Sequence, residues 1–467
     1  MRTKAIKYNY ILSHNARFEG KHYLNDNALN SMAIEVNAEK CSLLADIANA
    51  FNPPVFKRQF CNCTEKSVMY FQSSDVPVVN ESSPIYIYKN QVEALNLLVH
   101  PQDILITGFG TIGNVRLVSK LQDGVCYANN VCRVRTKDCI SVGYVYAFLS
   151  TKYAQSQLNN NASGSVVRYI EAPGIKRTLI PNFSDSFQRD VNDLIQESAR
   201  LREEASHMLT KAEKIMKESA NLRDLIPEDY DYFGPRGAER EVSCFVRNRK
   251  DITTTTINAF NLSERIRKTK ASMPCATKPL KEVLLGGDTF STGSFPRVEV
   301  KEGYGIMLIN QKDIFDTIIK GKYISKRGVK TDSMVEYGEV LVAGVGTLGE
   351  NETFCRTIFA NEDLVGQLVS GEFIRMKVNN EVPSGYLYTW LASDYGFRFL
   401  RNIQAGTKLC RPIPRLVLEI PVPIIDSDKM NEIDKLVKEA HTKRFEANNN
   451  ERKAIHMVEE EIEKWNK

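Results

Sequence analysis

Glycines spaced as in a phosphate-binding loop occur at two places in the chain. The pattern G-x-G-x-x-G lies at 108–113, directly after the apolar run 104–107. It returns 236 residues later at 344–349, after the apolar run 340–343. Between a strand and a helix, such a loop holds the pyrophosphate of a dinucleotide. The chain therefore carries either two nucleotide sites or a duplicated domain whose glycines serve another purpose.

The residues that follow the glycines favour duplication. A pyrophosphate sits on the amino terminus of a helix, so a nucleotide site needs a helix directly after the loop. Residues 114–118 are instead β-branched and alternating, and 350–354 are polar without a helical stripe. The acidic residue that would bind the ribose, about 20 positions later on a second strand, has no convincing candidate in either copy. We expect strand, glycine turn and strand in each copy, with the glycines allowing positive φ.

Other patterns that could do chemistry are absent or incomplete. The sequence has no Walker A, G-x-S-x-G or H-E-x-x-H motif, and Asn52-Pro53-Pro54-Val55 lacks the aromatic residue of an amino-methyltransferase motif. The ten cysteines are scattered, with Cys61-x-Cys63 the one close pair. We expect free thiols in a reducing compartment, no metal site and no catalytic residue.

Length and composition bound the architecture. The 467 residues suffice for two or three domains with cores of their own. The net charge is only +5, so a nucleic-acid surface must come from local clusters of Lys and Arg. There is no amino-terminal apolar segment of the signal-peptide kind and no run of 18 apolar residues. We expect a soluble, cytoplasmic, prokaryotic protein.

Residues 184–225 contain no Gly or Pro and keep a heptad of apolar and small side chains, which predicts a long helix. At 1.5 Å per residue it would span roughly 60 Å, too long to be stable without a partner. The residues predicted to pair are Val191, Leu194, Ser198, Leu201, Ala205, Met208, Ala212, Ile215 and Leu222.

A second long helix is predicted at the end of the chain, and it repeats the first. Residues 385–393 match 143–150 at a spacing of 242, and the same spacing carries the row of small residues into 426–467. Its pairing residues are Ile433, Leu436, Ala440, Ala447 and Ala454. Asn448-Asn449-Asn450 predicts a break in this helix. A single helix from Gly143 to Leu158 is also expected in the first copy.

The predicted fold is therefore α+β, with two similar domains and two long helices related by an internal pseudo-twofold repeat. Antiparallel pairing of the helices would place the domains at opposite ends. The expected segments are a first domain at 1–183, a central helix at 184–226, a second domain at 227–425 and a terminal helix at 426–467.

This duplicated order resembles the specificity subunit of type I restriction–modification systems. The first set of matching motifs lies at 103–113, 144–150, 162–165, 180–181 and 184–225, and the second at 339–349, 386–393, 405–407, 420–421 and 426–467. The second copy departs from the pattern at 343–345 and at the predicted helix break.

The resemblance implies a non-catalytic subunit that binds double-stranded DNA. Each domain would be a target-recognition domain that reads one half of a bipartite target. The helices would set the spacer and dock two methyltransferase subunits, through which motor–nuclease subunits join. S-adenosylmethionine, ATP and Mg would bind in those partners, with no cofactor in this chain.

Clustered cations are the candidates for phosphate contacts, and neighbouring side chains would read base edges. They are Lys57, Arg58, Gln59, Arg116, Arg168, Lys176 and Arg177 in the first domain, and Lys322, Lys326, Arg327, Lys330, Lys408 and Arg411 in the second. Any one of them could instead be a solvated surface charge. Arg116, on the strand after the glycine turn, could face DNA or form a salt bridge.

Three alternatives remain open at this point. One is a specificity subunit of a related restriction or phage-defence system, whose partner is a fused methyltransferase–nuclease. Another is a helical scaffold protein without DNA binding, which steeply salt-dependent DNA affinity would exclude. The third is a nucleotide-binding enzyme, which titration with NAD or S-adenosylmethionine would reveal.

Overall fold

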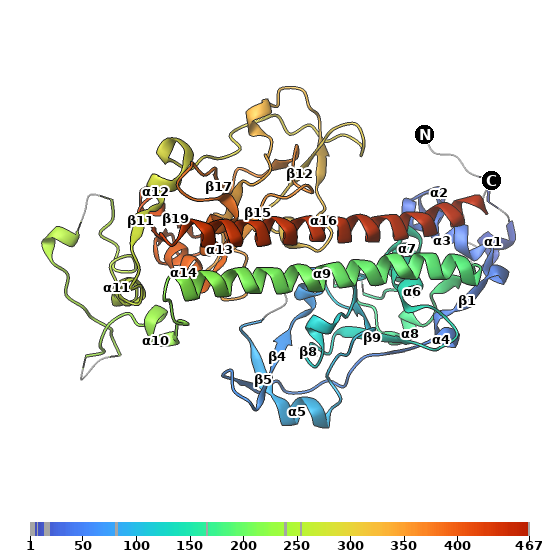
Figure 1. The fold of residues 1–467 in the computed structure, drawn as a ribbon. Helices are drawn as coiled ribbons and strands as arrows, with labels where there is room; N and C mark the ends of the chain where they lie inside the picture. The colour runs from blue at the N-terminus through green and yellow to red at the C-terminus, as the bar shows by residue number, and fades with distance from the viewer. Residues whose placement is uncertain are drawn as a thin grey trace. The chain divides into compact units, whose positions relative to one another are not determined.

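The computed structural model describes residues 5–6, 8–13, 19–79, 83–164, 167–237, 241–252 and 255–465. Ser165 of the first loop motif, the first four residues and the last two therefore lie outside the described residues. The chain divides into two compact units, Met1–Glu203 with Glu446–Lys467, and Glu204–Phe445. Both long helices, which are drawn in Figure 1, cross this division, so each unit contains part of each helix.

The first unit contains two four-stranded sheets and a two-stranded sheet of β1 and β10. The larger of the four-stranded sheets is antiparallel, in the order β2-β9-β6-β7, and the smaller has the order β3-β5-β4-β8. The strands are β1 Cys41–Leu43, β2 Ala48–Phe51, β3 Phe60–Cys61, β4 Ser67–Phe71, β5 Tyr86–Tyr88, β6 Ile104–Thr107, β7 Val115–Leu117, β8 Cys126–Tyr127, β9 Val131–Thr136 and β10 Leu179–Pro181. The helices before the long one are α1 Tyr8–Ser13, α2 Gly20–Tyr23, α3 Asp26–Glu35, α4 Leu44–Ile47, α5 Lys89–Ala94, α6 Val142–Ser150, α7 Lys152–Asn160 and α8 Ala172–Ile175.

The second unit repeats this arrangement with three strands instead of four in each of its two main sheets. Its central sheet has the order β15-β14-β17 and its smaller sheet the order β13-β12-β16. The strands are β11 Thr277–Pro279, β12 Ile306–Ile309, β13 Lys322–Ile324, β14 Val340–Ala343, β15 Thr357–Phe359, β16 Leu368–Val369, β17 Phe373–Met376, β18 Gln404–Ala405, β19 Arg411–Pro412 and β20 Pro421–Pro423. The helices besides the long ones are α10 Pro227–Tyr230, α11 Glu264–Ala271, α12 Leu280–Val283, α13 Ser384–Ala392, α14 Asp394–Asn402 and α15 Pro414–Val417.

The two units share the same strand register and some of the same side-chain hydrogen bonds. Ile104 pairs with Val134 in the first unit, and the corresponding Val340 pairs with Met376 in the second. The Tyr144 hydroxyl donates to the carbonyl of Pro181 at 2.7 Å, and the Tyr386 hydroxyl to that of Pro423 at 2.8 Å. The predicted α+β fold with an internal repeat is thus confirmed.

Two long helices contribute side chains to the hydrophobic core of each unit. They are α9 Asp185–Ser219 and α16 Ser427–Lys464, and α9 ends six residues before the predicted Leu225. In the first unit the early part of α9 and the late part of α16 share one core, which contains Val191, Ile195, Ala454, Val458 and Ile462. In the second unit the late part of α9 and the early part of α16 do so, through Ala212, Met216, Ile433 and Val437. The helices therefore pair antiparallel, as expected.

The predicted break at Asn448-Asn449-Asn450 is wrong, because α16 runs through these residues without interruption. Asn448 is buried, and its amide oxygen accepts a hydrogen bond from Arg202 at 2.8 Å. The polar run is thus one layer of a helix interface rather than a turn. A buried polar residue of this kind costs stability but fixes the register of paired helices.

The two predicted pairing rows are not equally buried. The row of small residues lies in the interface, where Ser198 donates to the carbonyl of Ala447 at 2.8 Å. In the other row Leu201 and Leu222 are buried, whereas Leu194, Met208, Ile215 and Leu436 are only partly buried. Ile195 and Met216 are buried instead. A helix of 3.6 residues per turn drifts away from a strict seven-residue repeat, which moves the contact stripe by one residue.

The continuous helix predicted from Gly143 to Leu158 is also wrong. The chain leaves helical geometry at Thr151, whose side chain accepts from the Ala154 amide and caps α7. Ser393 does the same before α14. Ser and Thr at such positions satisfy amides that lack an intrahelical partner.

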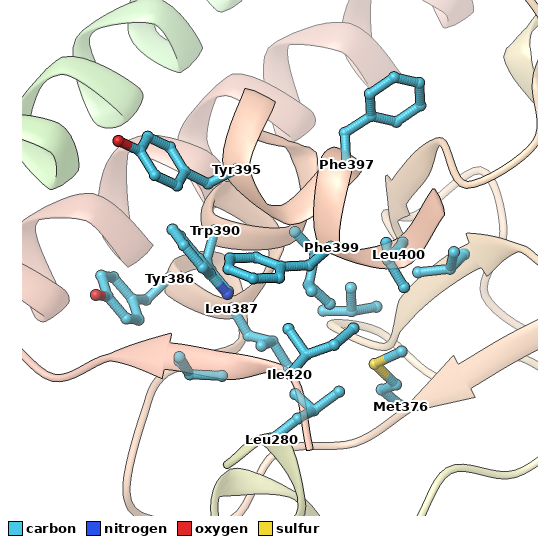
Figure 2. Packing of buried hydrophobic residues seen from close by; sticks show 14 of the residues in the cluster. Leu280, Met376, Tyr386, Leu387, Trp390, Tyr395, Phe397, Phe399, Leu400 and Ile420 are labelled. Atoms are coloured by element: carbon cyan, nitrogen blue, oxygen red, sulfur yellow. The ribbon is translucent and has the colours of Figure 1, made fainter. Parts of the chain in front are cut away.

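The core of the second unit is rich in aromatic residues (Figure 2). Trp390 of α13 is fully buried and stacks on Tyr395 of α14, with ring centroids 6.0 Å apart. Leu280 and Ile420 belong to the same cluster. Among the described residues, no helix combines the length and the apolar character that crossing a membrane requires.

Candidate nucleic-acid interface

Each glycine motif forms the turn between two antiparallel strands. In the first unit the motif connects β6 to β7, and the Gly113 amide donates to the carbonyl of Thr107 at 2.9 Å. In the second unit it connects β14 to β15. No helix follows either loop, so neither forms the helix terminus on which a pyrophosphate would sit. The predicted strand, glycine turn and strand are confirmed.

The two glycine loops differ in backbone conformation. Gly110 and Gly113 have φ values of 77° and 86°, in the left-handed region that favours glycine. The glycines of the second motif do not have positive φ, and there Cys355 has a φ of 66°. The expectation of positive φ therefore holds only for the first copy. The second loop has six more residues before its return strand, which allows another path.

In each unit a helix side chain donates a hydrogen bond to the last glycine of the loop. The Gln155 side chain donates to the Gly113 carbonyl at 2.7 Å, and the Arg401 guanidinium donates to the Gly349 carbonyl at 3.2 Å. Gln155 lies on α7 and Arg401 on the corresponding α14. The two units thus hold equivalent glycine carbonyls in place with different side chains.

A second loop, between the helix and β10 or β20, lies against each glycine loop. In the first unit Ser163 pairs with Tyr169, and the Ile170 amide donates to the Gly108 carbonyl at 2.8 Å. In the second unit Ala405 pairs with Arg411, and Gly346 exchanges two backbone hydrogen bonds with Cys410. The structure therefore brings three predicted cations to the glycine loops. They are Arg168 in the first unit, and Lys408 and Arg411 in the second; all three are exposed.

The other predicted clusters lie at the smaller sheets. Lys57, Arg58 and Gln59 precede β3 and are exposed, and Arg58 lies 5.6 Å from the ring centre of Tyr70. In the second unit Lys322 lies on β13 and forms an ion pair with Glu299. Lys326, Arg327 and Lys330 follow in the exposed loop after β13.

The sequence reading missed Arg297 and Lys301 at this smaller sheet. They flank an extended segment that pairs with β13, since the Val300 amide donates to the Tyr323 carbonyl at 2.9 Å. This segment is the counterpart of β3, and Arg297 thus takes the place of the 57–59 cluster in the second unit. The spacing between motifs changes within this segment, so a fixed offset along the sequence could not have found it.

Arg116 is partly buried and contacts backbone carbonyls, and no salt bridge joins it to any acidic side chain that the structure describes. Its guanidinium donates to the carbonyls of Val78 at 2.6 Å and Val76 at 3.4 Å. Lys176 and Arg177 lie at the end of α8, where the Lys176 carbonyl accepts from Ala45. Lys176 is partly buried and Arg177 is exposed.

Three further arginines are structural. Arg375 is fully buried and pairs through two nitrogens with Glu339, at 2.8 Å and 2.9 Å. Arg135 pairs in the same way with Asp103, which corresponds to Glu339. Burial lowers the pKa of Arg133 to about 10. Arg375 and Arg133 are buried in the central sheets and are not available to a ligand, whereas Arg135 is partly exposed and is paired with Asp103. In the described part of the chain no group of His, Cys, Asp and Glu is placed to bind a metal ion.

No protein-family model and no curated protein matches the chain. Three solved structures show what it is similar to. One is the S subunit of a type I restriction–modification system from M. genitalium, with 13% identity, a TM-score of 0.36, and coverage of 91% of this chain and 95% of that one. Another is the HsdS subunit from Thermoanaerobacter tengcongensis, with 13% identity, a TM-score of 0.28, and coverage of 90% and 95%. The type IIG restriction endonuclease BpuSI matches at 12% identity and a TM-score of 0.30, over 40% of this chain and 29% of that one.

Proposed function

We propose that the chain is the DNA sequence-specificity subunit of a type I restriction–modification complex and has no catalytic function of its own. Each unit reads one half of a bipartite target in double-stranded DNA. Methyl transfer and cleavage belong to partner subunits, which bind S-adenosylmethionine, ATP and Mg. The four segments 1–183, 184–226, 227–425 and 426–467 remain the proposed functional division.

The observation that carries this proposal is the duplication of one fold around two antiparallel helices. Strand register, the tyrosine bonds to Pro181 and Pro423 and the bracing of Gly113 and Gly349 all recur. A dimeric DNA reader recognises two half-sites at a fixed spacing because it presents two equivalent surfaces. One chain with two equivalent units can do the same, and units that have diverged can read two different half-sites.

Surface cations supply the affinity in this proposal. The described cations at the glycine loops and smaller sheets are exposed, including Arg58 and Arg411, whereas Arg375 and Arg133 are buried. Exposed groups such as Arg58 and Lys408 would contact phosphates, which gives binding without sequence preference. The long helices would set the spacing between half-sites and dock two methyltransferase subunits, to which the motor–nuclease subunits bind.

Selection from a randomised duplex DNA library tests the proposal. The full chain, purified together with the methyltransferase that it captures from its own host, should enrich two short conserved blocks at a constant spacing. A library that stays random after selection would refute the proposal. Loss of affinity with rising salt would exclude a scaffold protein without DNA binding. Identification of the captured subunit would separate a lone methyltransferase from a fused methyltransferase–nuclease.

A further inference from the structure

We infer that the two glycine turns and the loops against them carry the side chains that read bases, and that the two units read different bases with them. The first reading surface consists of Phe109, Val167 and Tyr169, and the second of Leu409 and Arg411. This inference rests on the proposed function and deepens it, because it separates the residues that read the sequence from those that bind phosphate.

The two reading surfaces have the same backbone framework, which includes the equivalent residues Gly164 and Gly406. Gly164 and Gly406 occupy equivalent positions with φ values of 89° and 106°. A Cβ atom on Gly164 would lie 2.2 Å from the Val167 carbonyl oxygen, and one on Gly406 would lie 2.5 Å from that of Leu409. The backbone at Gly164 and at Gly406 therefore requires glycine. Together with the hydrogen bonds to the glycine loops, it fixes where the neighbouring side chains point.

Each of the two loops has an exposed apolar side chain at the equivalent position. Val167 is 63% exposed and its counterpart Leu409 is 59% exposed. The ring of Phe109 stacks on that of Tyr169 at 5.5 Å, and both rings are more than a third exposed. Exposed apolar side chains that lie next to one another are typical of a contact surface. Such groups contact thymine methyl groups or enter between base steps.

The residue two positions after the exposed apolar side chain differs between the units. Tyr169 corresponds to Arg411 in the duplicated loop, since each pairs with the equivalent residue, Ser163 or Ala405. In the described part of the chain Arg411 has no carboxylate partner, so its guanidinium is free to bind a ligand. A guanidinium can bond both O6 and N7 of guanine, which an aromatic ring cannot. The two surfaces therefore share a scaffold but differ in what they can recognise.

This difference favours DNA over a protein as the occupant. Two identical partner subunits docked on equivalent surfaces would each need the same side chains. A bipartite target with unlike halves needs different side chains on a common frame. Arg168 supports the same reading, because Asn159 holds its guanidinium beside the first surface, where it can contact a phosphate.

Replacement of Arg411 tests the second surface. The duplex that the wild-type chain selects, and all its single-base-pair variants, serve as probes. Arg411→Ala should abolish the preference at one base pair of one half-site, a loss of about 5- to 100-fold in discrimination. The other half-site should be unaffected. Arg411→Lys should keep most of the affinity but not that preference, because a single ammonium cannot make the paired bonds.

Arg415→Ala is the matched control, because Arg415 is an exposed arginine on the adjacent α15 of the same unit. It should leave the discrimination between probes unchanged. In the first unit, Tyr169→Ala should alter the other half-site, and Tyr169→Phe should not. Unchanged Trp390 fluorescence would show that the second unit of each Arg411 variant is folded.

The outcomes separate this inference from the function on which it rests. Variants that select the wild-type sequence with discrimination within twofold of wild type would overturn the inference and leave the proposed function standing. So would variants that lose only the captured methyltransferase, since that result would make the surface a protein-docking site. A wild-type chain that enriches no sequence would overturn both.

Discussion

Replacement of Glu451 by leucine should destabilise the first unit selectively. Glu451 lies on α16 and is 2% exposed. One carboxylate oxygen accepts from the Tyr146 hydroxyl at 2.5 Å, and the other lies 2.6 Å from the Arg202 guanidinium on α9. Arg202 also donates to Asn448, so four side chains form one polar layer between the helices. Burial, and then the Glu451 charge, raise the pKa of Tyr146 well above its usual value.

The expected loss of stability follows from the partly buried Arg202 charge that remains unpaired when the Glu451 carboxylate is removed. Removing one partner of a buried ion pair costs about 3–5 kcal/mol, because the other charge stays buried. The Arg202 side chain is 23% exposed and keeps some hydration, which favours the lower end, about 3 kcal/mol. Leucine should fit sterically, because Leu209 occupies the equivalent position in the second unit. The loss would therefore measure electrostatics rather than packing.

Urea denaturation can follow each unit through its own tryptophan. The two tryptophans of the chain are Trp465, which lies 5.4 Å from Phe183 in the first unit, and Trp390 in the core of the second. In single-tryptophan backgrounds, Glu451→Leu should lower the midpoint reported by Trp465 and leave that reported by Trp390 nearly unchanged. Glu446→Leu, at an exposed position on α16, is the control and should have little effect.

A double variant completes the test. Arg202→Met together with Glu451→Leu should recover most of the lost stability, since an apolar pair replaces the ionic one. The reasoning would be refuted if Glu451→Leu left the Trp465 transition in place, or if the double variant were less stable than the single one.

Three further predictions follow from single sites. Burial keeps the pKa of His441 well below its usual 6.5, so the unfolded chain takes up a proton at a higher pH than the folded chain does. The second unit should therefore lose stability as pH falls below about 6.5. His441→Phe should flatten this dependence of stability on pH in thermal unfolding, and an unchanged slope of stability against pH would contradict the prediction. Gly406→Ala should cost about 1–3 kcal/mol in denaturant unfolding, because a φ of 106° and a contact of 2.5 Å both oppose a Cβ atom, whereas Gly303→Ala, whose added Cβ meets nothing within 4 Å, should cost less. Arg327→Ala should reduce the slope of log affinity against log salt by about one while leaving the selected sequence unchanged, and a changed sequence would show that Arg327 reads bases.

The sequence predicted the repeated architecture because glycines, apolar runs and I-P motifs recur in order at nearly constant spacing. Strand–turn–strand around Gly108 and Gly344 followed from β-branched residues where a helix should begin. The break at Thr151 was missed, although a threonine before a helical run is a capping signal. The polar run at Asn448 was misread because a buried polar layer between helices resembles a turn until its partner, Arg202, is known.

The candidate site could be predicted only in part. Exposed cations such as Arg58 were found from clustering alone, but clustering could not show that Arg116 donates to backbone carbonyls. The pairing of Phe109 with Tyr169 depends on a loop contact between residues 60 positions apart. Such contacts depend on tertiary folding, and periodicity along the sequence does not encode them.

The central claim is that one chain reads two separate DNA segments with two equivalent units. Hydroxyl-radical footprinting of the full chain with its captured methyltransferase, on the duplex selected from the library, tests it most directly. We predict two protected patches, and Arg411→Ala should weaken protection or sequence preference at only one of them. A single continuous protected patch, or equal loss at both patches in Arg411→Ala, would contradict the account.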